Sequence, residues 1–527
     1  MKPISLSKTS QLLIATTVAI LTTGFLRLQL FSGVPDVDGG FYTFHAQYIH
    51  YALTHGQDLK TMTLNLYQFM TAWVYGFEVN QYILLRLIDG LVAVAASAVF
   101  FKVILKESGS PLFSVILATS LFIIINDIEL IAYGFKNPTW AAYLPLFSAL
   151  LIWQNISKED KYSFYLIGGL ISLGILLREP FLPFFLLAAI AIFIGYGWRV
   201  LIKYAIGSAV VGFSVLGVML MFRGWDLLDL INSYRATGVE FWVWDKDYMV
   251  KGILKLAGET LQKFWFILTT ASISIFYLIK LYSTNKKLVN TNRFSFWLAV
   301  TLLPLLEWFF KMGLPYHLAN CLIGLAGLSA MGWKHLMTQE SQKVTTSSIL
   351  IIGLLSLIVI LPTINRTLIK SSNIYGPIDA IKWAKASDSF RGDQMIERSQ
   401  YLKVAAKVYG LSREDSTLAV SGFWQPIYPL TGLLPPIFTL SHLRSLYLEH
   451  NYDENKIIEV IKKYQPTIIV SSKDAWRGEA DIPGIIEKTN LYEKVDGLAG
   501  VPKEIGDTGQ DINSNLSAII YRLKNFK

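Results

Sequence analysis

Long apolar segments recur along the first 364 residues of this 527-residue chain and restrict its fold more than any other feature. Most are comparable in length to a helix that crosses the hydrocarbon core of a bilayer, about 20 residues. They lie at about 10–32, 81–105, 112–126, 139–154, 164–177, 181–197, 204–222, 261–281, 294–312, 317–335 and 346–364. Since lipid offers the backbone no hydrogen-bond partners, spanning segments of this kind fold as helices. The sequence therefore predicts a polytopic α-helical membrane protein with about 11 transmembrane helices, and excludes a purely soluble one.

Charged residues divide the chain into two parts. From Asn365 onward, 21 basic and 19 acidic residues occur in 163, which is the density of an ordinary soluble domain. The preceding 364 residues carry 26 basic and 19 acidic residues, about half that density. We therefore predict a transmembrane domain over residues 1–364 and a water-soluble domain over residues 365–527. Most of the net charge of +9 lies in the first part and no basic tract occurs, so nucleic acid is not an expected partner.

Lysine and arginine collect on alternate connections between the apolar segments. These basic residues are Lys2, Lys8, Lys102, Lys106, Lys158, Lys161, Arg199, Lys203, Lys286, Lys287, Arg293, Lys334 and Lys343. Cytoplasmic loops carry such an excess, so we expect a multi-pass protein of the plasma (inner) membrane with a cytoplasmic N-terminus. An odd number of spans then places the C-terminal domain outside the cytoplasm. The single cysteine, Cys321, leaves that domain without an intramolecular disulfide.

The C-terminal part has the pattern of an α/β domain. Short apolar runs at 417–421, 467–471 and 517–521 indicate buried strands. A helical pattern over 455–464 precedes the second strand, with Asp453 or Asn451 as the predicted N-cap. This alternation predicts a small sheet covered by helices.

The first predicted outer loop, residues 33–80, contains the main candidate for chemistry. It opens with DVDGG at 36–40 and continues into two aromatic-rich helical stretches, 41–55 and 65–77, which we expect to lie at the membrane interface. Asp36 and Asp38 suit a general base, a cation-stabilising pair or metal ligands. Equally, an aspartate in such a turn can serve only to cap the following helix.

Further charged side chains collect on the same predicted face. Asp127 and Glu129 follow the third apolar segment, and Arg178 lies in a very short connection. A later connection contains Glu307, Lys311, Tyr316 and His317. Each alone suits an interfacial side chain, but charge near hydrocarbon is costly and, as a set, marks a substrate pathway.

Several of these segments resemble the GT-C glycosyltransferases, polytopic enzymes that use polyprenyl-phosphate-linked sugars. Asp38-Gly-Gly-Phe-Tyr42 resembles the Asp-Glu-x-x-Tyr segment of their first outer loop. GGLISLGILLREP at 168–180 and KMGLPYH at 311–317 are similar to two later stretches. SGFWQPIYPLTG at 421–432, followed by QPTIIV at 465–470, is similar to the outer domain of bacterial protein-mannosyltransferase and aminoarabinose-transferase types. Gly39 replaces the usual glutamate and Glu179 replaces a glycine.

The resemblance implies a GT-C-like catalytic domain over residues 1–364 that transfers a hexosyl or pentosyl group, with inversion, at the extracytoplasmic face. The donor would be a polyprenyl-phosphate-linked sugar, and the acceptor would be a lipid, glycan or protein. Membrane lipids would surround the protein. Asp38 takes the position of the base, and Asp127 or Glu129 that of a second acid. The candidate substrate-binding residues are Asp36, Tyr42, Arg178, Lys311, Tyr316 and His317. No cofactor is required, and a divalent metal such as Mg²⁺ or Mn²⁺ is optional because the leaving group is a lipid phosphate.

Three alternative functions stay open from the sequence. Within the enzymes, a polysaccharide polymerase or ligase acting on diphosphate-linked oligosaccharides would show similar features. A secondary transporter would also place charges near the membrane, but more often shows repeated halves with broken helices. A non-catalytic assembly or sensor protein would need only the anchors and the soluble tail.

Overall fold

The computed structural model describes most of the chain outside several connections and a long segment after residue 339. The described residues are 7–27, 37–57, 59, 66–77, 81–126, 137–156, 162–178, 181–223, 228, 246–284, 291–310, 319–339, 398–421, 424–441, 443, 453–471, 481–497 and 518–526.

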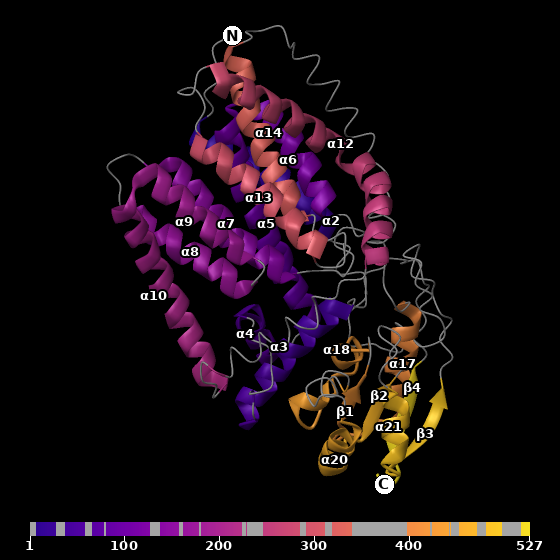
Figure 1. The fold of residues 1–527 in the computed structure, drawn as a ribbon. Helices are drawn as coiled ribbons and strands as arrows, with labels where there is room; N and C mark the ends of the chain where they lie inside the picture. The colour runs from indigo at the N-terminus through magenta and orange to yellow at the C-terminus, as the bar shows by residue number, and fades with distance from the viewer. Residues whose placement is uncertain are drawn as a thin grey trace.

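Helices account for the N-terminal part (Figure 1). They are α1 Lys8–Ala19, a π-turn Ile20–Gly24, α2 Phe25–Arg27, α3 Val37–His55, α4 Leu66–Ala72, a 3-10 turn Trp73–Gly76, α5 Gln81–Ser108, α6 Pro111–Ile125, α7 Asn137–Asn155, α8 Ser163–Leu177, α9 Leu182–Tyr196, α10 Trp198–Arg223, α12 Lys246–Thr284, α13 Thr291–Phe310 and α14 Ala319–Gln339. Each predicted apolar segment from residue 10 to residue 335 overlaps a helix within the described residues. The last, 346–364, lies outside the described residues.

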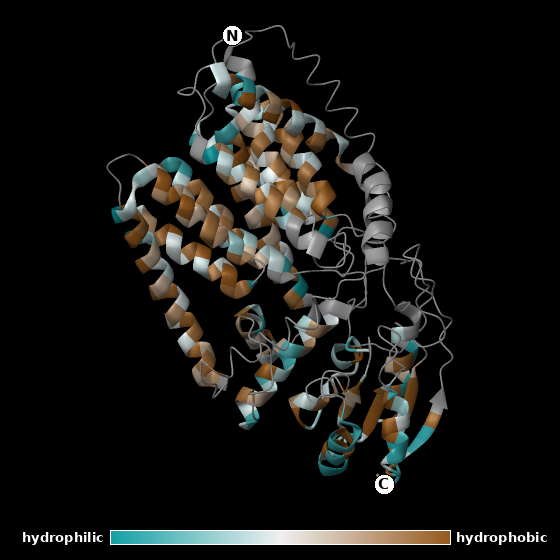
Figure 2. Ribbon diagram, in the orientation of Figure 1, coloured by the Kyte–Doolittle hydropathy of each residue, from teal (hydrophilic) through white to brown (hydrophobic). Residues whose placement is uncertain are grey.

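Within the described residues, four stretches are both long and apolar enough to cross a membrane, namely Lys8–Arg27, Leu84–Ser108, Trp198–Phe222 and Phe264–Thr284. Four shorter apolar helices accompany them. Helix α10 exposes large apolar side chains such as Phe213 and Met221, as a helix facing lipid does. Figure 2 shows the same apolar character over most helices of this part. The protein is therefore a membrane protein, and the number of spans stays a prediction.

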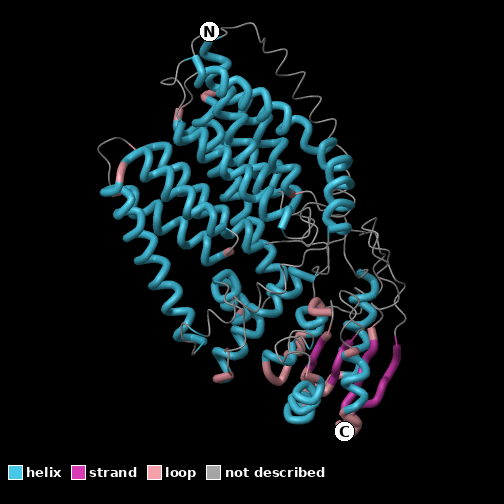
Figure 3. The backbone as a smooth tube through the Cα atoms, in the orientation of Figure 1, coloured by secondary structure: helices cyan, strands magenta, loops and turns pink. Residues whose placement is uncertain are grey.

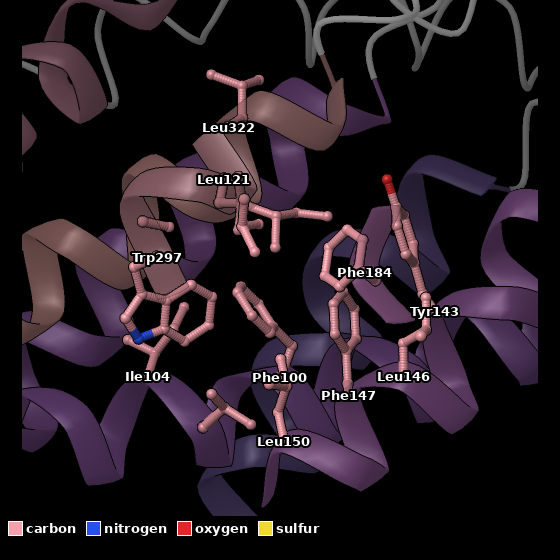
Figure 4. Close-up of a cluster of buried hydrophobic side chains, with 14 of the residues drawn as sticks. Phe100, Ile104, Leu121, Tyr143, Leu146, Phe147, Leu150, Phe184, Trp297 and Leu322 are labelled. Carbon is pink, nitrogen blue, oxygen red and sulfur yellow. The ribbon is translucent and has the colours of Figure 1, made fainter. Parts of the chain in front are cut away.

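Glycines let several of these helices approach closely. A Cβ added at Gly168 of α8 would lie 2.1 Å from the carbonyl oxygen of Tyr204, and one at Gly207 of α10 would lie 2.0 Å from that of Tyr165. Small residues at crossings are the usual means by which membrane helices pack. Aromatic side chains fill the wider crossings: Phe100 of α5 lies 4.4 Å from Phe147 of α7, ring centre to ring centre (Figure 4).

The C-terminal part contains a four-stranded sheet with helices beside it (Figure 3). Its elements are α17 Arg398–Leu411, β1 Leu418–Val420, α18 Ile427–Thr431, a 3-10 turn Phe438–Ser441, α20 Glu454–Tyr464, β2 Ile468–Ser471, α21 Ile482–Lys488, β3 Tyr492–Gly497 and β4 Ile519–Leu523. The strand order is β1-β2-β4-β3, with β1 and β2 parallel and the other pairs antiparallel. The three predicted strands coincide with β1, β2 and β4, whereas β3 was not predicted. Asp453 caps α20, as predicted, by accepting a hydrogen bond from the Asn455 amide at 3.0 Å.

Helix α3 joins the two parts of the molecule. Phe44 stacks on Tyr428 of α18, with ring centres 4.1 Å apart, and Phe44 and Tyr48 are each only 1% exposed. The Gln47 amide also donates to the carbonyl oxygen of Gly432 at 3.2 Å. These two rings were expected at the membrane interface, but they are buried in a core that α3 shares with β1, β2 and α17. Helix α3 is therefore part of the packing of the C-terminal sheet.

Candidate functional site

Two of the predicted substrate-binding residues lie together at one end of the helical part. Tyr42 is in the second turn of α3, and Arg178 is the residue at which α8 ends. The Arg178 guanidinium lies 3.5 Å from the Tyr42 hydroxyl and donates to it, although the residues are 136 positions apart. Arg178 is half-buried. The fold thus presents a cation and a phenol to the same space.

The predicted base lies four residues before Tyr42 in the same helix. Asp38 belongs to the first turn of α3 by its backbone, and its side chain is outside the described part. Helix α3 therefore begins four residues earlier than the predicted 41–55 stretch, and it includes Asp38. The remaining candidates, Asp36, Asp127, Glu129, Lys311, Tyr316 and His317, lie outside the described residues.

A buried charged cluster lies beneath α3. Arg86 is fully buried in α5 and lies 3.4 Å from the carboxylate of Asp89. Its guanidinium also donates to the Thr43 hydroxyl of α3 at 3.0 Å. The Tyr67 hydroxyl of α4 donates to the other oxygen of Asp89 at 2.6 Å. The Tyr67 ring packs edge-on against Tyr42, with centres 6.2 Å apart, so this cluster adjoins the Tyr42–Arg178 pair.

Arg27, at the end of α2, adds a second buried guanidinium. It is 2% exposed, and its charge interacts with those of Arg86 and Asp89. The guanidinium also lies 5.6 Å from the ring of Trp140 at the start of α7. Arg27 and Arg86 thus bring two buried guanidinium groups close to the carboxylate of Asp89. Guanidinium groups match the geometry of phosphate.

The sequence patterns did not single out this cluster, although they contained its signal. Arg27 interrupts the predicted apolar segment 10–32, and Arg86 and Asp89 interrupt the segment 81–105. An ionisable residue within a transmembrane segment is by default a candidate functional residue.

The C-terminal part contacts the first turns of α3. A Cβ at Gly40 would lie 2.8 Å from Cγ of Pro426 and 2.9 Å from its Cα and nitrogen. Nearby, burial raises the pKa of Tyr428 well above its ordinary value, so its phenol stays protonated and donates to the Ser441 carbonyl at 3.1 Å. Pro426 thus packs against Gly40, which follows Asp38 by two residues in α3.

Metal ligands are not gathered in the described residues. No group of three or more histidine, cysteine, aspartate or glutamate side chains there could hold a metal ion. Asp36, Asp127 and Glu129 lie outside that part of the chain. The described part of the site is therefore formed by the arginines and the residues that contact them.

Solved structures show which known fold this arrangement matches. The chain is similar to ArnT from Cupriavidus metallidurans, solved with bound undecaprenyl phosphate, over 98% of both chains, with 10% identity and a TM-score of 0.52. It also matches the arabinofuranosyltransferase AftD from Mycobacteria with 12% identity and a TM-score of 0.47, over 98% of this chain and 40% of that one. No family model and no curated protein matches the sequence. The likeness to ArnT is one of fold alone.

Proposed function

We propose that this protein is a membrane glycosyltransferase that moves a sugar from a polyprenyl-phosphate-linked donor to a lipid, glycan or protein acceptor at the extracytoplasmic face. The observation that carries the proposal is the arginine cluster beneath α3, in a chain with the fold of ArnT. ArnT was solved with undecaprenyl phosphate, a lipid whose headgroup is a phosphate. Guanidinium groups bind such a headgroup through charge-assisted, often bidentate hydrogen bonds.

The donor phosphate is assigned to the arginines. Arg178 is the more accessible of them, and it sits beside Tyr42. Arg27 and Arg86 lie deeper, where a low dielectric strengthens their interaction with an anion. Their charges would stabilise the lipid phosphate as it leaves. Lys311, with Tyr316 and His317, is proposed to complete this side of the site.

The acceptor is assigned to the side where α3 begins. The acceptor oxygen attacks the anomeric carbon, the bond from that carbon to the phosphate oxygen breaks, and the lipid phosphate leaves with the bonding electrons. One such displacement inverts the anomeric configuration. Asp38 takes the proton of the acceptor hydroxyl, and Asp127 or Glu129 orients the acceptor or the base. Asp36 shapes the turn, and a divalent metal such as Mg²⁺ or Mn²⁺ is optional.

A donor comparison tests the proposal. The purified full chain in lipid nanodiscs would be incubated with an undecaprenyl-phosphate-linked sugar, a nucleotide sugar or an undecaprenyl-diphosphate-linked oligosaccharide, together with a bacterial membrane-lipid extract as acceptor. We expect release of undecaprenyl phosphate from the first donor only. Turnover of the diphosphate donor alone would identify a polymerase or ligase instead, and turnover of none would contradict a transferase.

The predicted topology has its own test. Reporter fusions after Lys343 should have a cytoplasmic signal, and fusions after Asn365 an extracytoplasmic signal. A cytoplasmic C-terminal part would place Asp38 on the side of the nucleotide sugars and contradict the proposed donor.

A further inference from the structure

The first long apolar helix is interrupted by a π-turn shortly before the buried Arg27. Helix α1 passes into the π-turn Ile20–Gly24, which passes into α2, and α2 ends at Arg27. The Phe25 amide donates to the Ile20 carbonyl, five residues earlier. Such a turn adds one residue to a helix and rotates the residues that follow by roughly 100°. Single π-turns are rare and frequently lie at functional sites.

Three buried polar side chains, which we call the polar triad, hold this turn against two other helices. The Thr23 hydroxyl lies 2.7 Å from the Ser97 hydroxyl of α5. The Asn126 side-chain amide, at the end of α6, donates to the Thr23 hydroxyl at 3.4 Å. Asn126 also donates to the Phe122 carbonyl at 2.7 Å, so its side chain is fixed from its own helix. Thr23, Ser97 and Asn126 are each 0% exposed.

The polar triad connects Arg27 to the helix that carries the rest of the arginine cluster. Thr23 and Arg27 are four residues apart, so they are neighbours on one face of their helix. Ser97 follows Asp89 by eight residues, about two turns along the same face of α5. Arg27 is buried, and its charge interacts with those of Arg86 and Asp89. An uninterrupted α-helix would rotate Arg27 by roughly 100° from its present direction.

Hydrogen bonds between membrane helices often serve packing alone. A pair of that kind occurs elsewhere in this protein, where the Thr270 hydroxyl of α12 lies 3.0 Å from the Ser329 hydroxyl of α14. Both of those residues belong to regular α-helices. The polar triad differs from that pair because it holds an irregular turn, four residues before a buried guanidinium.

We propose that Thr23, Ser97 and Asn126 are positioning residues, which hold the π-turn Ile20–Gly24 so that Arg27 reaches the donor phosphate. The identity of that phosphate rests on the proposed transferase function. Loss of a hydrogen bond in the polar triad lets the turn relax toward a regular α-helix, which carries Arg27 away from the anion. The expected defect is therefore weaker binding of the phosphate, and it depends on the presence of Arg27.

A double-mutant cycle tests this role without requiring turnover. Undecaprenyl phosphate would be titrated against the full chain in nanodiscs for wild type, Thr23→Val, Arg27→Gln and the double variant. Thr23→Val keeps the side-chain shape and removes the hydroxyl, so we expect roughly fivefold weaker binding. Arg27→Gln should weaken binding roughly tenfold or more, because a charge-assisted hydrogen bond is lost. In the double variant, Thr23→Val should cause no further loss, because its effect passes through Arg27.

Two controls separate positioning from packing. Thr23→Ser keeps the hydroxyl and loses only the methyl group, so it should bind within about twofold of wild type. Thr270→Val removes the hydroxyl of the pair between α12 and α14, and it should leave binding unchanged. Thermal unfolding of each variant is measured in parallel. Ser97→Ala, which removes the partner hydroxyl on α5, gives the same test if Thr23→Val does not fold.

The remaining outcomes separate this inference from the proposed function. Equal affinities of wild type and Thr23→Val, or no binding by wild type, would overturn the positioning role, even if lipid release confirms the transferase. The same loss from Thr23→Val with and without Arg27, or a loss in Thr23→Ser as large as in Thr23→Val, would assign the polar triad to packing and also overturn it. A loss that requires Arg27, without lipid release from the sugar donor, would support the positioning role and contradict the transferase.

Discussion

Replacing Gly40 with alanine tests how firmly the start of α3 is held against the C-terminal part. In the structure the added Cβ would lie 2.8 Å from Cγ of Pro426 and 2.9 Å from its Cα and nitrogen. Ordinary contacts of a Cβ with such atoms are 3.4–4 Å. The ring and backbone of a proline cannot rotate away as a flexible side chain can. The two segments must therefore move apart by about half an ångström or more.

The size of the effect follows from two opposing terms. Overpacking of a close contact costs about 1–3 kcal/mol, and the rigid proline places this case near the upper end. Alanine in place of glycine within a helix recovers about 1 kcal/mol. The net weakening of the contact is thus about 2 kcal/mol, which corresponds to roughly a 30-fold change in an equilibrium constant.

Hydrogen exchange measures this local opening directly. The amides of α18, residues Ile427–Thr431, should exchange roughly 30-fold faster in Gly40→Ala, because their protection depends on the contact with α3. Gly410→Ala is the matched control. It lies in α17, where an added Cβ meets nothing within 4 Å, so only the helix gain applies.

The control should leave exchange in α18 unchanged or slower. If Gly40→Ala and Gly410→Ala gave the same exchange in α18, the close packing of α3 on Pro426 would be refuted. If transfer activity survived a 30-fold loss of protection, the assignment of the acceptor to this junction would also be contradicted.

Three further predictions concern the charged and aromatic groups around α3. Asp38→Asn should lower the transfer rate about 10²–10⁴-fold with donor binding unchanged, because it removes the proton acceptor, whereas Asp36→Asn should lower it much less. The reverse order would place the base at Asp36, and equal losses that Mn²⁺ rescues would indicate that the two aspartates bind a metal. Arg178→Gln should weaken binding of undecaprenyl phosphate by roughly tenfold or more, since a charge-assisted hydrogen bond is lost, whereas Tyr42→Phe should change the affinity less than about threefold. Equal affinities of wild type and Arg178→Gln in a lipid-binding titration would remove Arg178 from the phosphate site. Asp89→Ala should destabilise the protein by about 3–5 kcal/mol, because it leaves the buried Arg86 guanidinium without this carboxylate. In a thermal-unfolding assay, added undecaprenyl phosphate should restore part of the lost stability, whereas a variant as stable as wild type would show that other groups compensate the charge.

Much of the secondary structure could be predicted from the sequence, because each element is encoded by neighbouring residues. Long apolar segments form helices in a membrane because lipid offers the backbone no hydrogen-bond partners. Each predicted segment from residue 10 to residue 335 overlaps a helix within the described residues. The cap of α20 at Asp453 is likewise a local interaction. Strand β3 was not predicted, because YEKVDG at 492–497 lacks a continuous apolar run and gains its pairing only from β4.

The candidate site depended on contacts that no local pattern contains. Arg178 and Tyr42 are 136 residues apart, and only the folded chain brings the end of α8 beside the second turn of α3. Arg86 and Asp89 appear in the sequence as interruptions of an apolar segment, and they become a site only once Thr43 and Tyr67 pack over them.

Helix α3 shows the difference between the two levels most clearly. Its aromatic residues are suited to a membrane interface by composition alone. In the folded protein, Phe44 and Tyr48 are instead buried with Tyr428 in the core that α3 shares with the C-terminal sheet. The sequence by itself determined that these residues would form an aromatic helix beside Asp38. Only the tertiary structure decided what that helix packs against, since burial depends on segments almost 400 residues away.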